Sequence, residues 1–239
     1  MLTLMRQTLT YILLLAVSVC TGQSFKYPAI SSKAHNFSEF IPHGWILLDS
    51  ASGDLNKDNL NDIALVIQHR DSISITRARD GAVDTIVTQP RILILAFYNS
   101  NTRQYDLQLQ NNSFVLNHDQ ANMEDPFQNI SIASGVLKIE FTIFMNAGGW
   151  GMSNNAYIFR YRRNSFYLIG ADYNYTHRGS GETEDRSYNF LTKKVRVVTG
   201  TISADKQKIT WRSIKLNALK TFDTFLQPFT WQVEKDDYL

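Results

Sequence analysis

The stretch from residue 52 to residue 67 decides the fold, and it reads SGDLNKDNLNDIALVI. Its second part, residues 63–67, is an apolar run rich in β-branched residues, which is typical of a buried strand. Residues 44–49, just before the stretch, also read as a strand. We therefore predict two strands joined end to end by a polar loop.

Oxygen-bearing side chains occupy alternate positions in this loop, which is the spacing that lets a tightly wound segment surround a hard cation. The candidate Ca²⁺ ligands are the side chains of Asp54, Asn56, Asp58 and Asp62, together with the backbone carbonyl of Leu60. The alternative is a metal-free turn, because Asp and Asn also bond to their own backbone and tolerate a positive φ. Position 6 of the loop, where a sharp turn favours Gly, is Asn59, the next best residue there.

The loop shares its first five ligand positions with an EF-hand but has Leu65 at position 12, where an EF-hand places a bidentate Glu. It resembles instead the strand-loop-strand calcium site of the FG-GAP repeats in integrin α-chains and bacterial VCBS-type proteins. The resemblance covers about twenty residues, and it implies a calcium ion and an exported protein, of the kind seen in small, largely uncharacterised bacterial proteins. The loop occurs once and no longer repeat is present, so we do not expect a full propeller.

The rest of the chain predicts a mostly-β fold: a single antiparallel-sheet-rich domain with little helix. We expect it to span residues 36–232, between a flexible tail at 23–35 and a C-terminal tail at 233–239. A helical turn is expected near Asn36, a hairpin or loop at 69–89, and an apolar C-terminal segment laid over the core. Polar residues 111–129 and 177–186 read as loops. The further strands expected are 91–98, 105–109, 136–144, 155–162, 165–175, 195–200 and 208–213.

Residues 1–22 read as a secretory signal, with Arg6 before a short apolar stretch and small residues before a cleavage point at Gln23. The competing interpretation is lipoprotein processing, which would make Cys20 a lipid anchor. In either case we expect an exported protein, periplasmic or extracellular, without a transmembrane segment in its mature form.

The near-balanced net charge of +2 gives no electrostatic case for nucleic acid, so the partner we expect is an unidentified protein or glycan. Trp150, Tyr157 and Tyr161 are candidates for a ligand-binding surface, with core packing as the alternative. The function predicted is that of an exported, calcium-binding and non-enzymatic binding module. The alternative is an envelope glycan hydrolase that uses carboxylates such as Glu182, Glu184 or Asp185. No catalytic residue is assigned.

Overall fold

The computed structural model describes residues 25–79, 82–203 and 206–239. The expected signal sequence, its cleavage point and Cys20 lie outside these residues. No helix in the described part of the chain is long and apolar enough to cross a membrane.

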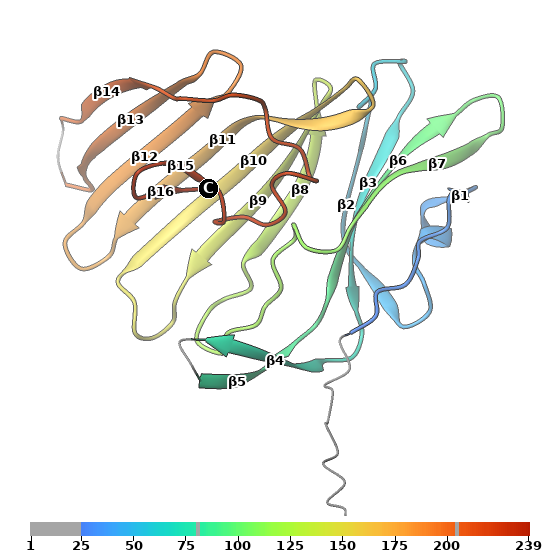
Figure 1. Ribbon diagram of the computed structural model, residues 1–239, viewed down its shortest axis with the longest axis horizontal. Helices are drawn as coiled ribbons and strands as arrows, with labels where there is room; N and C mark the ends of the chain where they lie inside the picture. Colours follow the sequence, from blue (N-terminus) through green and yellow to red (C-terminus); the bar gives the residue numbers. More distant parts are fainter. Residues whose placement is uncertain (1–24, 80–81, 204–205) are drawn as a thin grey trace, which may run out of the picture.

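Two antiparallel sheets make up most of the molecule, which confirms the mostly-β prediction (Figure 1). The five-stranded sheet has the order β1-β7-β6-β3-β2, and the seven-stranded sheet has the order β14-β13-β12-β11-β10-β9-β8. The first sheet consists of β1 (Lys33–Ala34), β2 (Trp45–Gly53), β3 (Asp62–His69), β6 (Arg91–Asn99) and β7 (Gln104–Asn111). The second consists of β8 (Phe127–Ala133), β9 (Val136–Phe144), β10 (Gly151–Arg162), β11 (Ser165–His177), β12 (Glu182–Asn189), β13 (Lys194–Thr201) and β14 (Lys208–Ser213).

The five-stranded sheet is covered on both faces, which explains why β3 and β6 are apolar without alternation. Val66 and Leu93 join the cluster shared with the seven-stranded sheet, whereas Leu65 and Ile92 join a second cluster on the far face. Residues 25–41, including the 3₁₀ turn η1 (Phe37–Phe40) capped by Asn36, cover that far face.

The segment expected to be a flexible tail is packed from residue 25 onward. Ile30 is buried, its amide donates to Gln110 Oε1 at 3.0 Å, and β1 pairs with β7. Phe25 and Tyr27 pack their rings near Trp45. The expected boundary at residue 36 therefore lies inside the packed structure, because a few apolar side chains spaced along a polar segment are enough to hold it.

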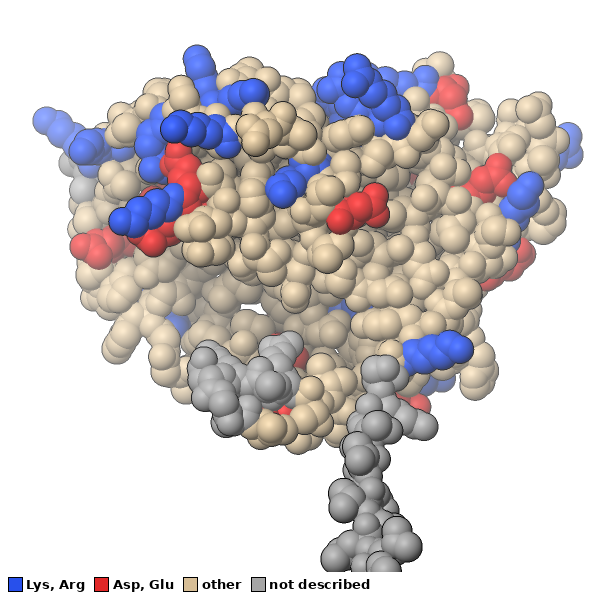
Figure 2. Space-filling view, in the orientation of Figure 1, with Lys and Arg blue, Asp and Glu red and all other residues tan. Residues whose placement is uncertain are grey.

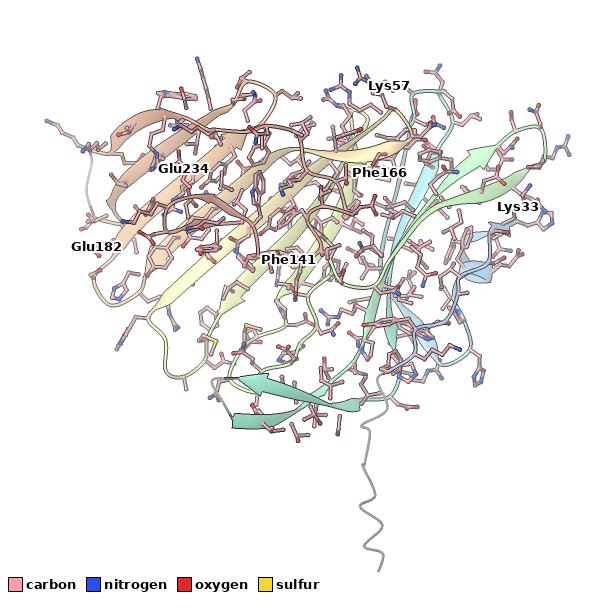
Figure 3. The ribbon with its side chains drawn as sticks, in the orientation of Figure 1. Lys33, Lys57, Phe141, Phe166, Glu182 and Glu234 are labelled. Atoms are coloured by element: carbon pink, nitrogen blue, oxygen red, sulfur yellow. The ribbon has the colours of Figure 1, made fainter. Side chains whose placement is uncertain are left out.

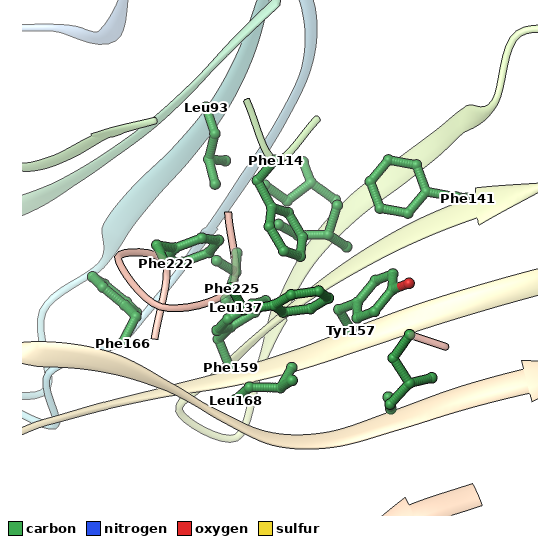
Figure 4. Packing of buried hydrophobic residues seen from close by; sticks show 14 of the residues in the cluster. Leu93, Phe114, Leu137, Phe141, Tyr157, Phe159, Phe166, Leu168, Phe222 and Phe225 are labelled. Atoms are coloured by element: carbon green, nitrogen blue, oxygen red, sulfur yellow. The ribbon is translucent and has the colours of Figure 1, made fainter. Parts of the chain in front are cut away.

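The C-terminal segment lies across the inner face of the seven-stranded sheet, as the apolar pattern predicted. Phe222 stacks on Phe159 with ring centroids 4.1 Å apart, and Phe225 packs against Phe114 (Figure 4). The segment ends in a small hairpin, β15 (Gln232–Glu234) and β16 (Asp237–Tyr238), whose last strand carries the buried Asp237. The expected tail at 233–239 is thus part of the packed structure too.

A hairpin of β4 (Ile73–Arg79) and β5 (Ala82–Thr88), which we call the arm, forms a separate two-stranded sheet. It confirms the hairpin expected at 69–89, and it runs below the seven-stranded sheet in Figure 1. Besides the short β1, β15 and β16, two longer strands were not predicted from the sequence. They are β8 and β12, which lie partly in the polar stretches expected to be loops.

Candidate functional site

The loop between β2 and β3 is a compact turn built around the carboxylate of Asp54. One carboxylate oxygen of Asp54 accepts the amides of Lys57 and Asp58 at 2.6 and 3.2 Å, and the other accepts the amide of Asn59 at 2.9 Å. Lys57 and Asn59 have positive φ angles of 70° and 66°, so the Asn at position 6 adopts the conformation expected of it. Lys57 marks the loop in Figure 3.

Asn56 and Asp58 face each other within the turn. The side-chain amide of Asn56 donates to Asp58 Oδ2 at 2.9 Å, and Asn56 Oδ1 accepts the Asp58 amide at 2.9 Å. Asp58 Oδ1 accepts the amide of Leu60 at 2.8 Å. Hydrogen bonds of this kind define successive Asx turns. The metal-free turn named above as the alternative has this arrangement.

Asp62 is fully buried at the start of β3. One of its carboxylate oxygens accepts the amides of Leu55 and Asn56 at 2.8 and 3.3 Å, and the other accepts the amide of Tyr98 at 3.1 Å. Burial raises the pKa of Asp62, while the three amides act in the opposite direction and the nearby Asp58 carboxylate adds to the increase. Asp62 therefore ties the loop to the end of β6.

The loop is also held against the seven-stranded sheet. A Cβ placed on Gly53 would lie 2.6 Å from Cγ2 of Ile132 in β8, so only Gly allows the two strands to approach this closely. Asp49, earlier in β2, accepts the amide of Ile130 at 3.0 Å. The turn therefore sits where the edges of the two sheets meet.

The donor chemistry of the loop suits a hard cation, because an ionised carboxylate has about four acceptor positions. The hydrogen bonds above use three of these on Asp54, two on Asp58 and three on Asp62. Some acceptor capacity remains on each residue. These side chains, however, point toward the backbone amides of the loop. Among the described residues, no three acidic or histidine side chains are grouped as a metal site.

The three aromatic candidates do not form one surface. Trp150 is 67% exposed, but Tyr157 is 1% exposed and lies in the main core beside Phe114. Tyr161 is half-buried and packs edge-on against Phe97 with centroids 4.7 Å apart. The expectation of a ligand-binding surface is therefore wrong for Tyr157, because the side of β10 that carries it faces the core.

The three carboxylates considered for hydrolysis do not converge on one point. Glu184 bonds to the Arg186 guanidinium at 2.6 Å, while the adjacent Asp185 points to the other face of β12 and accepts from Asn174 at 3.0 Å. Glu182 is exposed at the start of the strand, well away from the β2–β3 loop (Figure 3).

A hollow that the sequence analysis did not find lies between the arm and the seven-stranded sheet (Figure 2). It has two connected parts of about 660 and 680 Å³, which share Asp119 and Gln120 in their walls. The first part has a mixed wall, formed by the arm, the 112–126 segment, the C-terminal segment and the inner face of the seven-stranded sheet. Its apolar residues include Ile75, Met123, Ile143, Tyr173 and Phe229, and polar residues such as Asn117, Gln120 and Ser153 lie among them. The second part is more polar, with Asp84, Thr88, Arg91, His118 and Asp125 in its wall.

Arg91 fixes one wall of this hollow. It is 2% exposed, forms a bidentate pair with Asp125, donates to the Leu116 carbonyl at 2.7 Å and donates to Gln68 Oε1 at 2.9 Å. Thr88 is 3% exposed, and its hydroxyl has no hydrogen-bond partner among the described residues. The sequence contained one signal for this wall, which is Arg91 at the start of an apolar strand. A buried Arg needs a carboxylate partner, so a carboxylate beside it could have been expected.

No family model matches this chain, and the searches of curated proteins and of solved structures found no match either.

Proposed function

We propose that this chain is an exported, non-enzymatic binding protein that holds a small ligand in the hollow beneath the arm. The observation that supports this most directly is the hollow itself, whose two parts, about 660 and 680 Å³, have the size of small-molecule sites. Its wall mixes apolar side chains such as Met123 and Phe229 with polar ones such as Gln120 and Arg91, which suits a ligand that carries hydrogen-bonding groups on an apolar body.

The charges in the wall favour binding over hydrolysis. Both oxygens of Asp125 are committed to Arg91, and a carboxylate held in this way serves structure better than proton transfer. The alternative, a glycan hydrolase, is supported by Asp84 and Asp119 in the same wall. Release of reducing sugar from envelope glycans, lost in both Asp84→Asn and Asp119→Asn, would favour the hydrolase.

A cavity-filling variant tests the binding proposal. Ile143 lines the first part of the hollow, so Ile143→Trp should fill it, while Leu191→Trp places the same side chain at an exposed site elsewhere. We expect native mass spectrometry of wild-type protein incubated with envelope extract to detect a bound small molecule. The Leu191→Trp protein should retain it and the Ile143→Trp protein should lose it. Equal retention by both variants would place the ligand outside the hollow.

Calcium binding by the β2–β3 loop is a second proposal, supported by the oxygen-rich donor set and its remaining acceptor capacity. Asp54, Asn56, Asp58, the Leu60 carbonyl and Asp62 would hold the ion. A ligand that binds only the folded state raises the melting temperature. We expect millimolar calcium to do so in the wild type and in the exposed control Asp236→Ala, but not in Asp58→Ala. If the wild type melted identically in EDTA and in calcium, the loop would be a turn that is held by its own hydrogen bonds and binds no calcium.

Export is the third part of the proposal, and it rests on the apolar segment at the start of the sequence. Mass spectrometry of protein from the envelope or medium should show a chain that starts near Gln23. A lipid adduct on Cys20 would favour the anchored form instead, and a full-length chain in the cytoplasm would contradict export.

A further inference from the structure

A second groove, of about 700 Å³, lies on the outer face of the seven-stranded sheet at its β12–β14 end. Its wall contains Lys194, Arg196 and Trp211, with Ser187, Asn189 and Ser213 beside them. The faces follow from the alternation along β13. Val195 and Val197 are buried in the main core, so Lys194 and Arg196 point outward. This groove is therefore separate from the hollow beneath the arm, which lies on the inner side of the sheet.

Trp211 is the exposed aromatic residue of the groove. It lies directly opposite Arg196 in the β13–β14 pairing, and Ser213 lies opposite Lys194, so all four side chains share the outer face. The Trp211 side chain is 63% exposed. A large indole left in water beside two outward-pointing cations has no packing role to account for its position.

The charge of this region differs sharply from that of the rest of the chain. Residues 191–220 contain eight Lys and Arg against one Asp, a net charge of +7. Because the whole chain has a net charge of +2, the remaining residues have a net charge of −5. Blue side chains accordingly gather along the upper edge of the molecule above the β12–β14 end (Figure 2).

Part of this positive charge is used within the fold and part is left free to bind. Arg212, at one end of the groove, is held by Glu234 at 3.0 Å and lies 3.8 Å from Asp237. Lys194 and Arg196, by contrast, have no salt bridge among the described residues. The residues of the groove wall include no carboxylate, and the carboxylate beside it, that of Asp172, accepts from the Ser187 hydroxyl at 2.7 Å. Lys194 and Arg196 are therefore available to bind an anion.

We propose that this groove binds an anionic polysaccharide, with its acidic groups against Lys194 and Arg196 and a sugar ring against Trp211. The side-chain amide of Asn189 and the hydroxyl of Ser213 suit the hydroxyl groups of a sugar. A single-stranded nucleic acid would require a series of aromatic platforms for successive bases, whereas the groove has one. A concave groove also suits an extended polymer better than a flat lipid surface.

Calorimetric titration with polygalacturonate oligomers tests this proposal, with the fully methyl-esterified oligomers as the uncharged counterpart. We expect the acid form to bind and the ester to bind at least roughly tenfold more weakly. Binding of the acid form should also weaken as salt rises, because exposed charges are screened beyond about 8 Å at physiological ionic strength. Equal binding of both forms, or binding of neither, would overturn the proposal.

Matched variants locate the site. Trp211→Ala and the double variant Lys194→Glu/Arg196→Glu should each weaken binding by roughly tenfold or more, as expected for central aromatic and cationic contacts. The controls Trp150→Ala and Lys26→Glu, which alter an exposed indole and an exposed cation elsewhere, should leave the affinity unchanged. Equal loss in the control variants would contradict the assignment. So would tighter binding of oligothymidylate or of phosphatidylglycerol vesicles than of the acid oligomers. Circular dichroism confirms that each variant is folded.

Discussion

The carboxylate of Asp62 joins two parts of the chain that are far apart in sequence. It accepts amides from Leu55 and Asn56 in the β2–β3 loop and from Tyr98 at the end of β6. Because an unpaired buried amide costs about 1–3 kcal/mol, this residue does more for stability than its place in a polar loop indicates. The sequence marked Asp62 as a metal ligand, but its contact with Tyr98 could not be seen without the pairing of β3 with β6.

Asp62→Asn should therefore lower the free energy of unfolding, by about 1–3 kcal/mol, because an amide group cannot accept on both sides. The loss should also depend on pH. Burial raises the pKa of Asp62 in the folded protein above its value in the unfolded chain. The folded state then keeps this proton to higher pH, so the contribution of Asp62 to stability falls as pH rises between the two pKa values.

Urea denaturation of both proteins between pH 3.5 and 7 measures this effect. The difference in unfolding free energy between wild type and Asp62→Asn should become smaller as pH rises. The control Asp58→Asn changes an exposed carboxylate in the same loop and should alter stability less. If the difference in unfolding free energy instead became larger as pH rises, the three amide hydrogen bonds would lower the pKa of Asp62 by more than burial raises it.

The C-terminal hairpin is fastened to the seven-stranded sheet by a buried charge network. Asp237 is 4% exposed; it accepts a hydrogen bond from Arg186 at 2.7 Å, and its two oxygens accept from the Tyr188 hydroxyl at 2.8 and 2.7 Å. This network explains why β12 escaped the sequence analysis. Its charged inner face reads as a solvated loop until a partner about fifty residues away is brought beside it.

Asp237→Ala should leave the Arg186 guanidinium partly buried with one of its acidic partners missing. Breaking a buried pair in this way costs about 3–5 kcal/mol, and thermal or urea unfolding should show the loss. The adjacent residue provides the control: Asp236 is exposed and has a φ of 61°, which Asn also tolerates, so Asp236→Asn should have little effect. Equal stability of the two variants would show that the hairpin is held by Trp231 and Leu239 packing alone.

The two strands of the arm, β4 and β5, pair only with each other, whereas β3 and β6 each have neighbours on both sides. A two-stranded ribbon is marginally stable in water, so its amides should open far more often than those of β3 and β6. Hydrogen–deuterium exchange followed by mass spectrometry should show residues 73–79 and 82–88 exchanging first and residues 63–67 and 92–96 exchanging last. Protection of the arm on adding a small ligand would in addition support binding beneath it.

Strands with regular alternation or with a continuous apolar run were predicted well, and the polar strands β8 and β12 were not. The alternation of Leu137, Ile139 and Phe141 with polar neighbours identified β9, and the apolar run of residues 63–67 identified β3. The arm was found from its turn signal. The hollow was not foreseeable, because its wall is assembled from the arm, the 112–126 segment and the C-terminal segment, and none of these shows a ligand-binding pattern by itself.

At the scale of the whole molecule, one aromatic cluster connects the two sheets with the C-terminal segment. Phe114 is fully buried at its centre, where its ring meets Phe141, Tyr157, Phe159, Phe222 and Phe225. Phe97 of β6 joins this cluster to the five-stranded sheet through Tyr161 and Phe166, so the two sheets and the C-terminal segment should unfold together.

Phe114→Ala should lower the free energy of unfolding by about 3–5 kcal/mol and leave a single cooperative transition. Differential scanning calorimetry measures both quantities. Phe37→Ala is the control, because Phe37 is 47% exposed and its loss should matter little. Two separate transitions in the wild type would show that the sheets are independent units.

The position of residues 214–239 as the inner cover of the seven-stranded sheet has a consequence for biosynthesis. A chain that has emerged only as far as β14 already contains Tyr157, Phe159 and Phe166, but not Phe222 and Phe225, which cover them. Its aromatic face would stay open to water until the cover is made. Such a nascent chain would remain a substrate for chaperones, and it would reach its compact form only late in synthesis.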